Sequence, residues 1–182
     1  MLKVVIPASE GFDNATGTFI TVKEQALQLE HSLVSLSKWE SKWQKPFLSN
    51  EPKSLAESLD YIRCMTLTQN VSPYVYTPFA MPASVLKEVS AYIDAPMTAT
   101  TFARNGGPKK NQEIITAEII YYWMICSNIP FECQKWHLNR LLTLINVCAI
   151  KGQKPQKIPR SEQLARNRAL NAARRKRLNT RG

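Results

Sequence analysis

The strongest helical pattern in the chain reads EIITAEIIYYWMIC and spans Glu113–Cys126. It is apolar almost all round, and its two acidic residues come early, where the helix dipole favours negative charge. A second pattern follows the break at Pro130 and spans residues 131–150, with its inward positions at helical spacing: Leu138, Leu141, Leu142, Ile145 and Cys148. We expect the two to form an antiparallel helix pair and place the hydrophobic core around it.

Three further helices are predicted upstream of this pair. Ser32 is a candidate N-cap for a helix that ends before Pro46. Ser54 and Glu57 form a capping-box pattern at the start of a helix over residues 54–68. The proline-containing stretch 70–82 predicts an irregular connection, Pro82 then begins a short helix over 83–93, and residues 96–110 read as a loop.

Strand-like composition opens the chain. Residues 3–6 and 18–22 are rich in β-branched side chains and are separated by the turn-forming residues 13–17, which predicts a hairpin. Residues 26–30 alternate with period two and predict a third strand. The expected fold class is therefore α+β and mainly α, with an N-terminal β-hairpin or three-stranded sheet packed on a helical bundle.

Charge divides the chain into two parts. Residues 1–150 contain 13 Lys/Arg and 13 Asp/Glu, whereas residues 151–182 contain 11 Lys/Arg and one acidic residue, so the second part accounts for the net charge of +10. Block charge of this kind is typical of an interaction tail. We expect a folded body over 1–150, a linker over 151–160 and a basic helical arm over 161–182, with Ser161 as its N-cap.

Basic residues of the arm are the first candidate binding residues: Arg166, Arg168, Arg174, Arg175, Lys176 and Arg177. Their charge suits an acidic partner or phosphate groups, while the absence of aromatic residues from the arm argues against stacking on single-stranded bases. A tail that is either solvated or docked on an acidic protein partner is favoured, nucleic acid is less favoured, and a membrane surface least. No stretch approaches the roughly 20 apolar residues that a membrane span needs.

Trp39 and Trp43 are the second candidate binding residues. They lie four positions apart and therefore share one face of the helix that follows Ser32. Two interpretations stay open for them, packing in the core and a face on which a partner helix docks.

Catalysis, cofactors and metals find no support in the sequence. His31 and His137 lie in no nucleophile motif, and both are expected to be structural. Glu113 and Glu118 diverge on their helix, so Glu118 is read as a buried or interfacial acid rather than half of a catalytic pair. Cys126, Cys133 and His137 lack the paired spacings of a zinc site, and the four cysteines are expected to be reduced and buried. We predict no enzyme activity, no cofactor and no metal.

Three segments resemble proteins encoded in the tail-gene clusters of tailed bacteriophages. They are LEHSLVSLSKWE at 29–40, the stretch from ITAE to the tryptophan at 115–123, and RALNAARR at 168–175. The most similar group is the tail assembly chaperones of long-tailed phages, and the resemblance extends over nearly the whole chain without a catalytic or ligand motif.

That resemblance implies a factor in the host cytoplasm that binds the long helical tape-measure protein and helps to recruit tail-tube subunits. It further implies that the apolar stripes of the tape measure stay covered until the tube polymerises around them. A structural tail or baseplate component of the virion is the first alternative, and a nucleic-acid-binding accessory protein acting through the arm is the second. Self-association of the chain stays open.

Overall fold

The fold is seen in a computed structural model, which describes residues 1–13, 17–102, 114–152 and 160–178. The chain divides into two compact units, Met1–Cys148 and Ala149–Gly182, and each is described by itself. The first unit is a mainly helical α+β body with four short strands at its N-terminal end.

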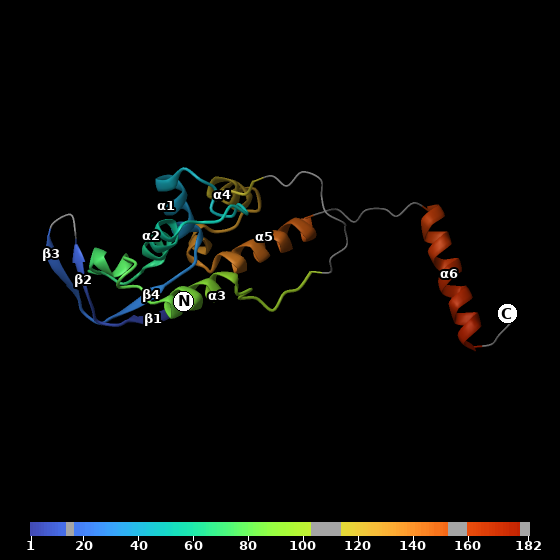
Figure 1. Ribbon diagram of the computed structural model, residues 1–182. Coiled ribbons are helices and arrows are strands. Elements are labelled where there is room, and N and C mark those ends of the chain that lie inside the picture. The colour runs from blue at the N-terminus through green and yellow to red at the C-terminus, as the bar shows by residue number, and fades with distance from the viewer. Residues whose placement is uncertain (14–16, 103–113, 153–159, 179–182) are drawn as a thin grey trace. The chain divides into compact units, whose positions relative to one another are not determined.

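The strands pair in two antiparallel sets. Their bounds are Leu2–Ile6 (β1), Ser9–Asp13 (β2), Thr18–Val22 (β3) and Gln25–Leu29 (β4). β1 pairs with β4, so that Leu2 lies opposite Leu29, and β2 pairs with β3, so that Phe12 lies opposite Phe19. Alternate residues of β1 and β4 are buried, and the β2–β3 hairpin projects away from the α-helices (Figure 1).

The predicted strand pairing was wrong in one respect. Residues 3–6 pair with the predicted third strand rather than with 18–22, whose partner is the unpredicted strand β2. Pro7 lacks an N–H and separates β1 from β2, and the sequence SEGFD of β2 lacks the β-branched residues that mark a strand. Of the predicted turn, residues 14–16 lie outside the described residues.

Six α-helices and two short 3-10 helices follow in the described part of the chain. Their bounds are Leu33–Trp43 (α1), Leu55–Met65 (α2), Pro73–Tyr76 (η1), Ala83–Asp94 (α3), Ala117–Cys126 (α4), Phe131–Lys135 (η2), Leu138–Gly152 (α5) and Arg160–Leu178 (α6). The predicted capping signals are confirmed: Ser32 and Ser54 each form a capping box, and Pro82 occupies the N-cap of α3. The predicted loop residues 103–110 lie outside the described residues.

The helix predicted over 113–126 begins four residues later than expected. Residues 114–116 are not helical, Glu113 lies outside the described residues, and α4 starts at Ala117. The Glu40 carboxylate explains the start, because its Oε2 accepts a hydrogen bond of 2.7 Å from the Ala117 N–H. A carboxylate from α1 thus replaces the local cap that Thr116 does not provide.

The helix predicted over 131–150 is interrupted. His137 was expected to lie inside this helix, but it lies between η2 and α5. His137 forms an isolated β-bridge with Ser32, and the Leu138 N–H donates to the His31 carbonyl at 2.7 Å. This pairing with the junction between β4 and α1 competes with helical geometry. It divides the segment into η2 and α5.

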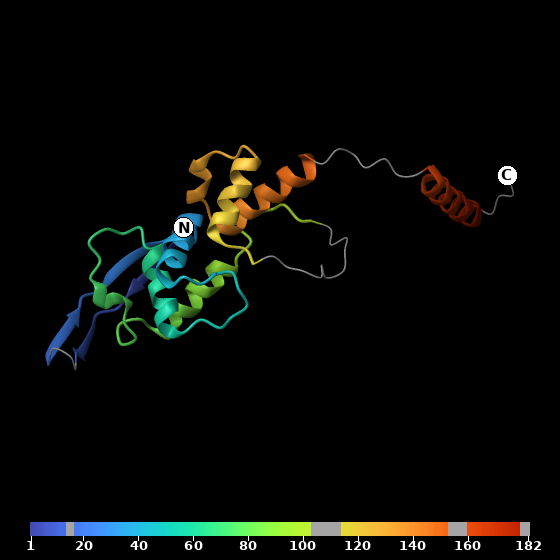
Figure 2. The same cartoon turned by 90° about the horizontal axis from the view of Figure 1, so that it is seen from above.

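The core is centred on α1 rather than on the α4–α5 pair. Leu33, Leu36 and Trp39 of α1 are fully buried, and α1 packs on α2, α4 and η2. Figure 2 shows α4 and η2 grouped with α5 at one end of the body, and α2 with α3 at the other. α5 buries Leu138, Leu141 and Ile145, as predicted.

The second unit contains α6. Because this helix begins at Arg160, Ser161 lies inside it and is not its N-cap. Residues 153–159 of the predicted linker lie outside the described residues, and Gly152 still belongs to α5. Taken by itself, α6 buries none of its side chains between Leu164 and Leu178. No helix within the described ranges is long and apolar enough to cross a membrane.

Candidate functional site

Trp39 and Trp43 stack on each other, with ring centroids 6.1 Å apart. Trp39 is 1% exposed, and its Nε1–H donates to the Glu57 carbonyl at 2.9 Å. Trp43 is half-buried and donates to Asp60 Oδ2 at 2.8 Å. A docking face containing Trp39 is therefore wrong, because α2 covers this residue. Trp43 lies at the edge of the same packed cluster.

Asp60 holds α1 and α2 together through its carboxylate. Lys42 donates to it at 2.6 Å, Arg63 at 2.8 Å and Trp43 at 2.8 Å. Burial raises the pKa of Asp60, but the hydrogen bonds from Lys42 and Trp43 outweigh it and hold that pKa below its ordinary value. The group is an ionised, fully engaged structural carboxylate.

His31 and His137 meet in the interior, with ring centroids 5.1 Å apart. His31 Nδ1 is hydrogen-bonded to the Tyr61 hydroxyl at 2.6 Å. His137 Nε2–H donates to the Tyr92 carbonyl at 3.0 Å, and its Nδ1 accepts from the Asn139 N–H at 3.3 Å. Burial lowers the pKa of both imidazoles. Both rings are buried, neutral and hydrogen-bonded, so the structural interpretation is confirmed.

The cysteines are all free, as predicted, but they are not all buried. Cys133 is buried and Cys64 and Cys148 are half-buried, whereas Cys126 is exposed at the end of α4. Within the described ranges, no group of three His, Cys, Asp or Glu side chains could hold a metal ion. Cys133 and His137 were expected to share one helix face. This is wrong, because Cys133 lies on η2 and His137 lies after the end of η2.

The outer face of α4 is an exposed apolar surface, although this helix was expected to lie at the centre of the core. Tyr122 is 62% exposed and Ile125 is 60% exposed, three positions apart, while Ala117 and Ile120 on the opposite side are fully buried. Glu118 is exposed on the outer face, so of the two expected roles, a buried or an interfacial acid, the buried one is wrong.

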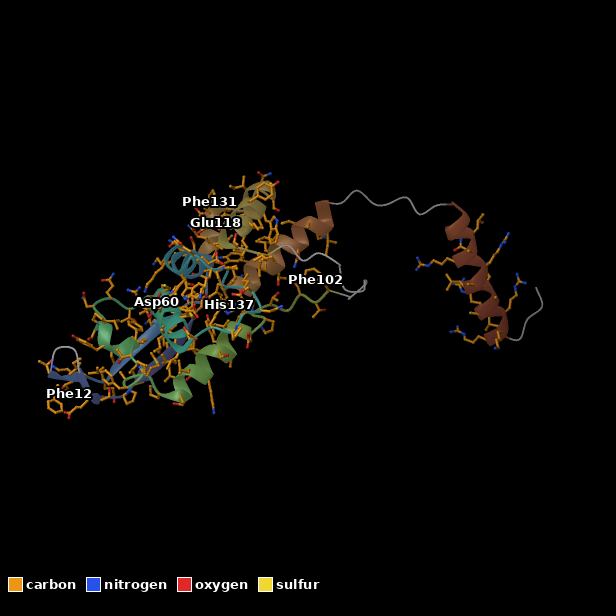
Figure 3. The ribbon with its side chains drawn as sticks, turned by 45° about the horizontal axis from the view of Figure 1, so that its top comes forward. Phe12, Asp60, Phe102, Glu118, Phe131 and His137 are labelled. Atoms are coloured by element: carbon orange, nitrogen blue, oxygen red, sulfur yellow. The ribbon has the colours of Figure 1, made fainter. Side chains whose placement is uncertain are left out.

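The neighbouring η2 extends this face. Phe131 is 53% exposed, and its ring lies 6.4 Å from that of Tyr121 on α4. Figure 3 shows Phe131 and Glu118 at the α4 end of the body, away from Phe12 on the hairpin. We call the exposed residues of this region the α4–η2 surface: Glu118, Tyr122, Ile125, Cys126 and Phe131.

The β2–β3 hairpin presents a second exposed apolar pair. Phe12 and Phe19 face each other across the strands with ring centroids 5.1 Å apart, and Phe19 is 82% exposed. Gly11 anchors the hairpin, because a Cβ at this position would lie 2.7 Å from the ring of Phe79. The hairpin therefore packs against Phe79 at the middle of β2 and is exposed at the adjacent aromatic pair.

A cleft of about 280 Å³ lies between α2 and α3. Its walls are mainly apolar and include Tyr61, Ile62, Val89 and Ile93. Lys53 is the charged group among the lining residues, and its Nζ lies 4.6 Å from the centroid of the Phe47 ring. Such a lining suits an apolar side chain better than a reacting polar substrate.

The candidate residues of the arm all lie on α6. The described side chains between Leu164 and Leu178 include six basic and no acidic groups, and every one is exposed within this unit. Arg168 and Arg175 border a shallow groove on the helix together with Asn171 and Ala172. The basic residues are thus presented by a regular helix.

The α4–η2 surface was missed in the sequence because an apolar helix predicts burial without indicating which of its faces has a neighbour.

No protein-family model, curated protein or solved structure matches this chain.

Proposed function

We propose that this protein is a tail assembly chaperone of a long-tailed phage and that its α4–η2 surface binds the tape-measure protein. The observation that carries the proposal is the outer face of α4, where Tyr122 and Ile125 are both more than half exposed at helical spacing. The phage resemblance of residues 115–123 falls on this same helix. It supports the choice of partner, and the geometry supports the choice of surface.

The α4–η2 surface suits a helical partner for two reasons. Tyr122 and Ile125 form part of a ridge at three-residue spacing, which packs into the groove of a neighbouring amphipathic helix. Glu118 borders that ridge and would pair with a basic residue of the partner, which fixes the direction of the bound helix. Covering the apolar stripe of the tape measure in this way would keep it from aggregating before the tube forms.

Co-expression with the tape-measure protein tests the proposal. We expect the full chain to raise the soluble fraction of the tape measure several-fold, and Tyr122→Asp combined with Ile125→Asp to abolish that effect. The matched control replaces another exposed apolar pair, Phe12→Asp with Phe19→Asp on the hairpin, and should keep the effect. An inactive parent chain, or equal losses in the two variants, would reject binding through α4.

Purified phage particles separate this function from that of a virion component. A chaperone is expected to be absent or far below stoichiometric amounts in the particle. Mass spectrometry that finds the chain in fixed proportion to the tail-tube protein would instead support a structural tail or baseplate component.

A further inference from the structure

Four of the six described basic side chains of α6, all of them arginines, form two rows on opposite sides of the helix, and Arg174 and Lys176 belong to neither row. Arg168 and Arg175 are about two turns apart and Arg166 and Arg177 about three turns apart, so the members of each pair lie above one another. Arg166 and Arg168 are separated by a rotation of about 200°. The helix therefore carries an arginine row on each of two opposite flanks.

The side of α6 between these rows is made of four alanines and one lysine. Ala165, Ala169, Ala172 and Ala173 lie there, and Lys176 joins them toward the C-terminal end. The larger Leu164, Leu178 and Arg174 lie on the side that faces away. A helix with this distribution presents a narrow front flanked by positive charge on both sides.

A protein partner does not account for this distribution. The surface of an acidic globular protein touches one side of a helix, which would leave the opposite arginine row in solvent. The major groove of duplex DNA has two phosphate walls about 12 Å apart, and an α-helix with its side chains is about 10–12 Å across. Arginine suits these walls because its guanidinium binds phosphate through two hydrogen bonds.

We propose that α6 binds in the major groove of double-stranded DNA, with one arginine row on each phosphate wall and the alanine side toward the bases. Alanine offers no hydrogen bond to base edges, so binding is largely independent of sequence. Four arginines on the phosphate walls predict a steep salt dependence, with log affinity falling by about 3–4 per tenfold rise in salt. The inference concerns the second unit and does not rest on the tape-measure function proposed for the body.

The test uses the full chain and a labelled DNA duplex of about two helical turns, with the fluorescence anisotropy measured over a salt series. The decisive variant keeps the net charge but moves one row: Arg166→Ala and Arg177→Ala combined with Leu164→Arg and Asn171→Arg. It places the positive charges on one side of the helix. We expect its affinity for the duplex to fall at least tenfold relative to the parent chain.

The matched control changes the same four positions and keeps both rows: Arg166→Lys, Arg177→Lys, Leu164→Gln and Asn171→Gln. Its affinity should stay within about threefold of the parent. A second variant, Ala172→Trp, keeps every charge but places an indole on the side toward the bases, and should weaken binding about fivefold or more. Circular dichroism checks that α6 remains helical in each variant.

Two results would overturn the proposal. One is a parent chain that binds poly-glutamate at least as tightly as the duplex at the same salt concentration, which would identify an acidic protein as the partner. The other is duplex binding that is unaffected both by moving the arginine row and by Ala172→Trp. Weaker binding to single-stranded DNA of the same length is expected, since the arm has no aromatic residue on which bases could stack.

Discussion

The body and the arm are both helical, but they are helical for different reasons. In the body, α1 contains Trp39 at 1% exposure and is held by hydrogen bonds to distant segments. In the arm, Leu170 of α6 is 49% exposed, and the helix is built of alanine and arginine, which have high intrinsic helix propensity. Burial should therefore make the body unfold cooperatively, whereas α6 should lose its helix gradually.

Truncation of a large apolar side chain in each region gives the largest contrast. Trp39→Ala removes a buried indole and a hydrogen bond to Glu57, and should lower the free energy of unfolding of the body by about 3–5 kcal/mol. Leu170→Ala in the arm should change it by less than about 0.5 kcal/mol. Chemical denaturation followed by tryptophan fluorescence measures both values. Equal effects would contradict the distinction between the two regions.

Mild acid should lower the free energy of unfolding of the body and leave the helicity of the arm unchanged. Burial, together with the neighbouring His137, lowers the pKa of His31 from 6.5 to about 3. Between these values the unfolded chain binds a proton that the folded body does not. Stability is therefore complete above pH 6.5 and falls as the pH drops toward 3, by roughly 1.4 kcal/mol per unit.

Urea denaturation of the parent and His31→Gln at pH 7 and pH 5 measures this dependence. The variant should lose much of the pH slope, although burial also lowers the pKa of His137, which leaves a part of it. The described side chains of α6 include no histidine or carboxylate, so arm helicity should not change over this interval. An unchanged slope in the variant would show that other groups govern the acid response.

Adding one methyl group at a glycine should distinguish a packed position from an open one. Gly11→Ala places a Cβ about 2.7 Å from the Phe79 ring and should destabilise the body by about 1–2 kcal/mol. Gly152→Ala, in the second unit, meets nothing within 4 Å and should be neutral or slightly stabilising. Thermal melts compare the two. Combining Gly11→Ala with Phe79→Ala should cost less than the sum of the single changes, because the clash is removed.

Helix propensity alone should determine the helix stability of the arm. A substitution that lowers this propensity is expected to have the smallest effect of the series. Ala169→Gly should cost α6 about 1 kcal/mol of helix stability without changing the melting temperature of the body. Far-ultraviolet circular dichroism of the full chain, recorded below the melting transition of the body, measures the loss. A coupled fall in the melting temperature would show that α6 contributes to the stability of the body.

Local signals in the sequence were enough to predict much of the fold. The N-cap at Ser32, the capping box at Ser54 and the role of Pro82 depend on near neighbours, and all three are confirmed. The fold class, mainly helical with strands at the N-terminus, follows from the same kind of signal.

What could not be predicted depends on distant segments. The Glu40 carboxylate decides where α4 begins, and the pairing of Ser32 with His137 decides where α5 begins. The candidate binding surfaces could not be predicted for the same reason. The burial of Trp39 and the exposure of Tyr122 depend on which helix lies beside each residue. For the arm, which was predicted to be helical, helical periodicity places four of the described arginines on two flanks, and Arg174 lies outside both.

The hydrogen bond from the Leu138 N–H to the His31 carbonyl joins residues more than a hundred positions apart. During synthesis, this hydrogen bond at the junction between β4 and α1 can form only after most of the polypeptide has been made. Until then the apolar residues of α1 lack part of their covering. A nascent chain is consequently most vulnerable to proteases and to misassociation just before that late segment emerges, and the arm is made only afterwards.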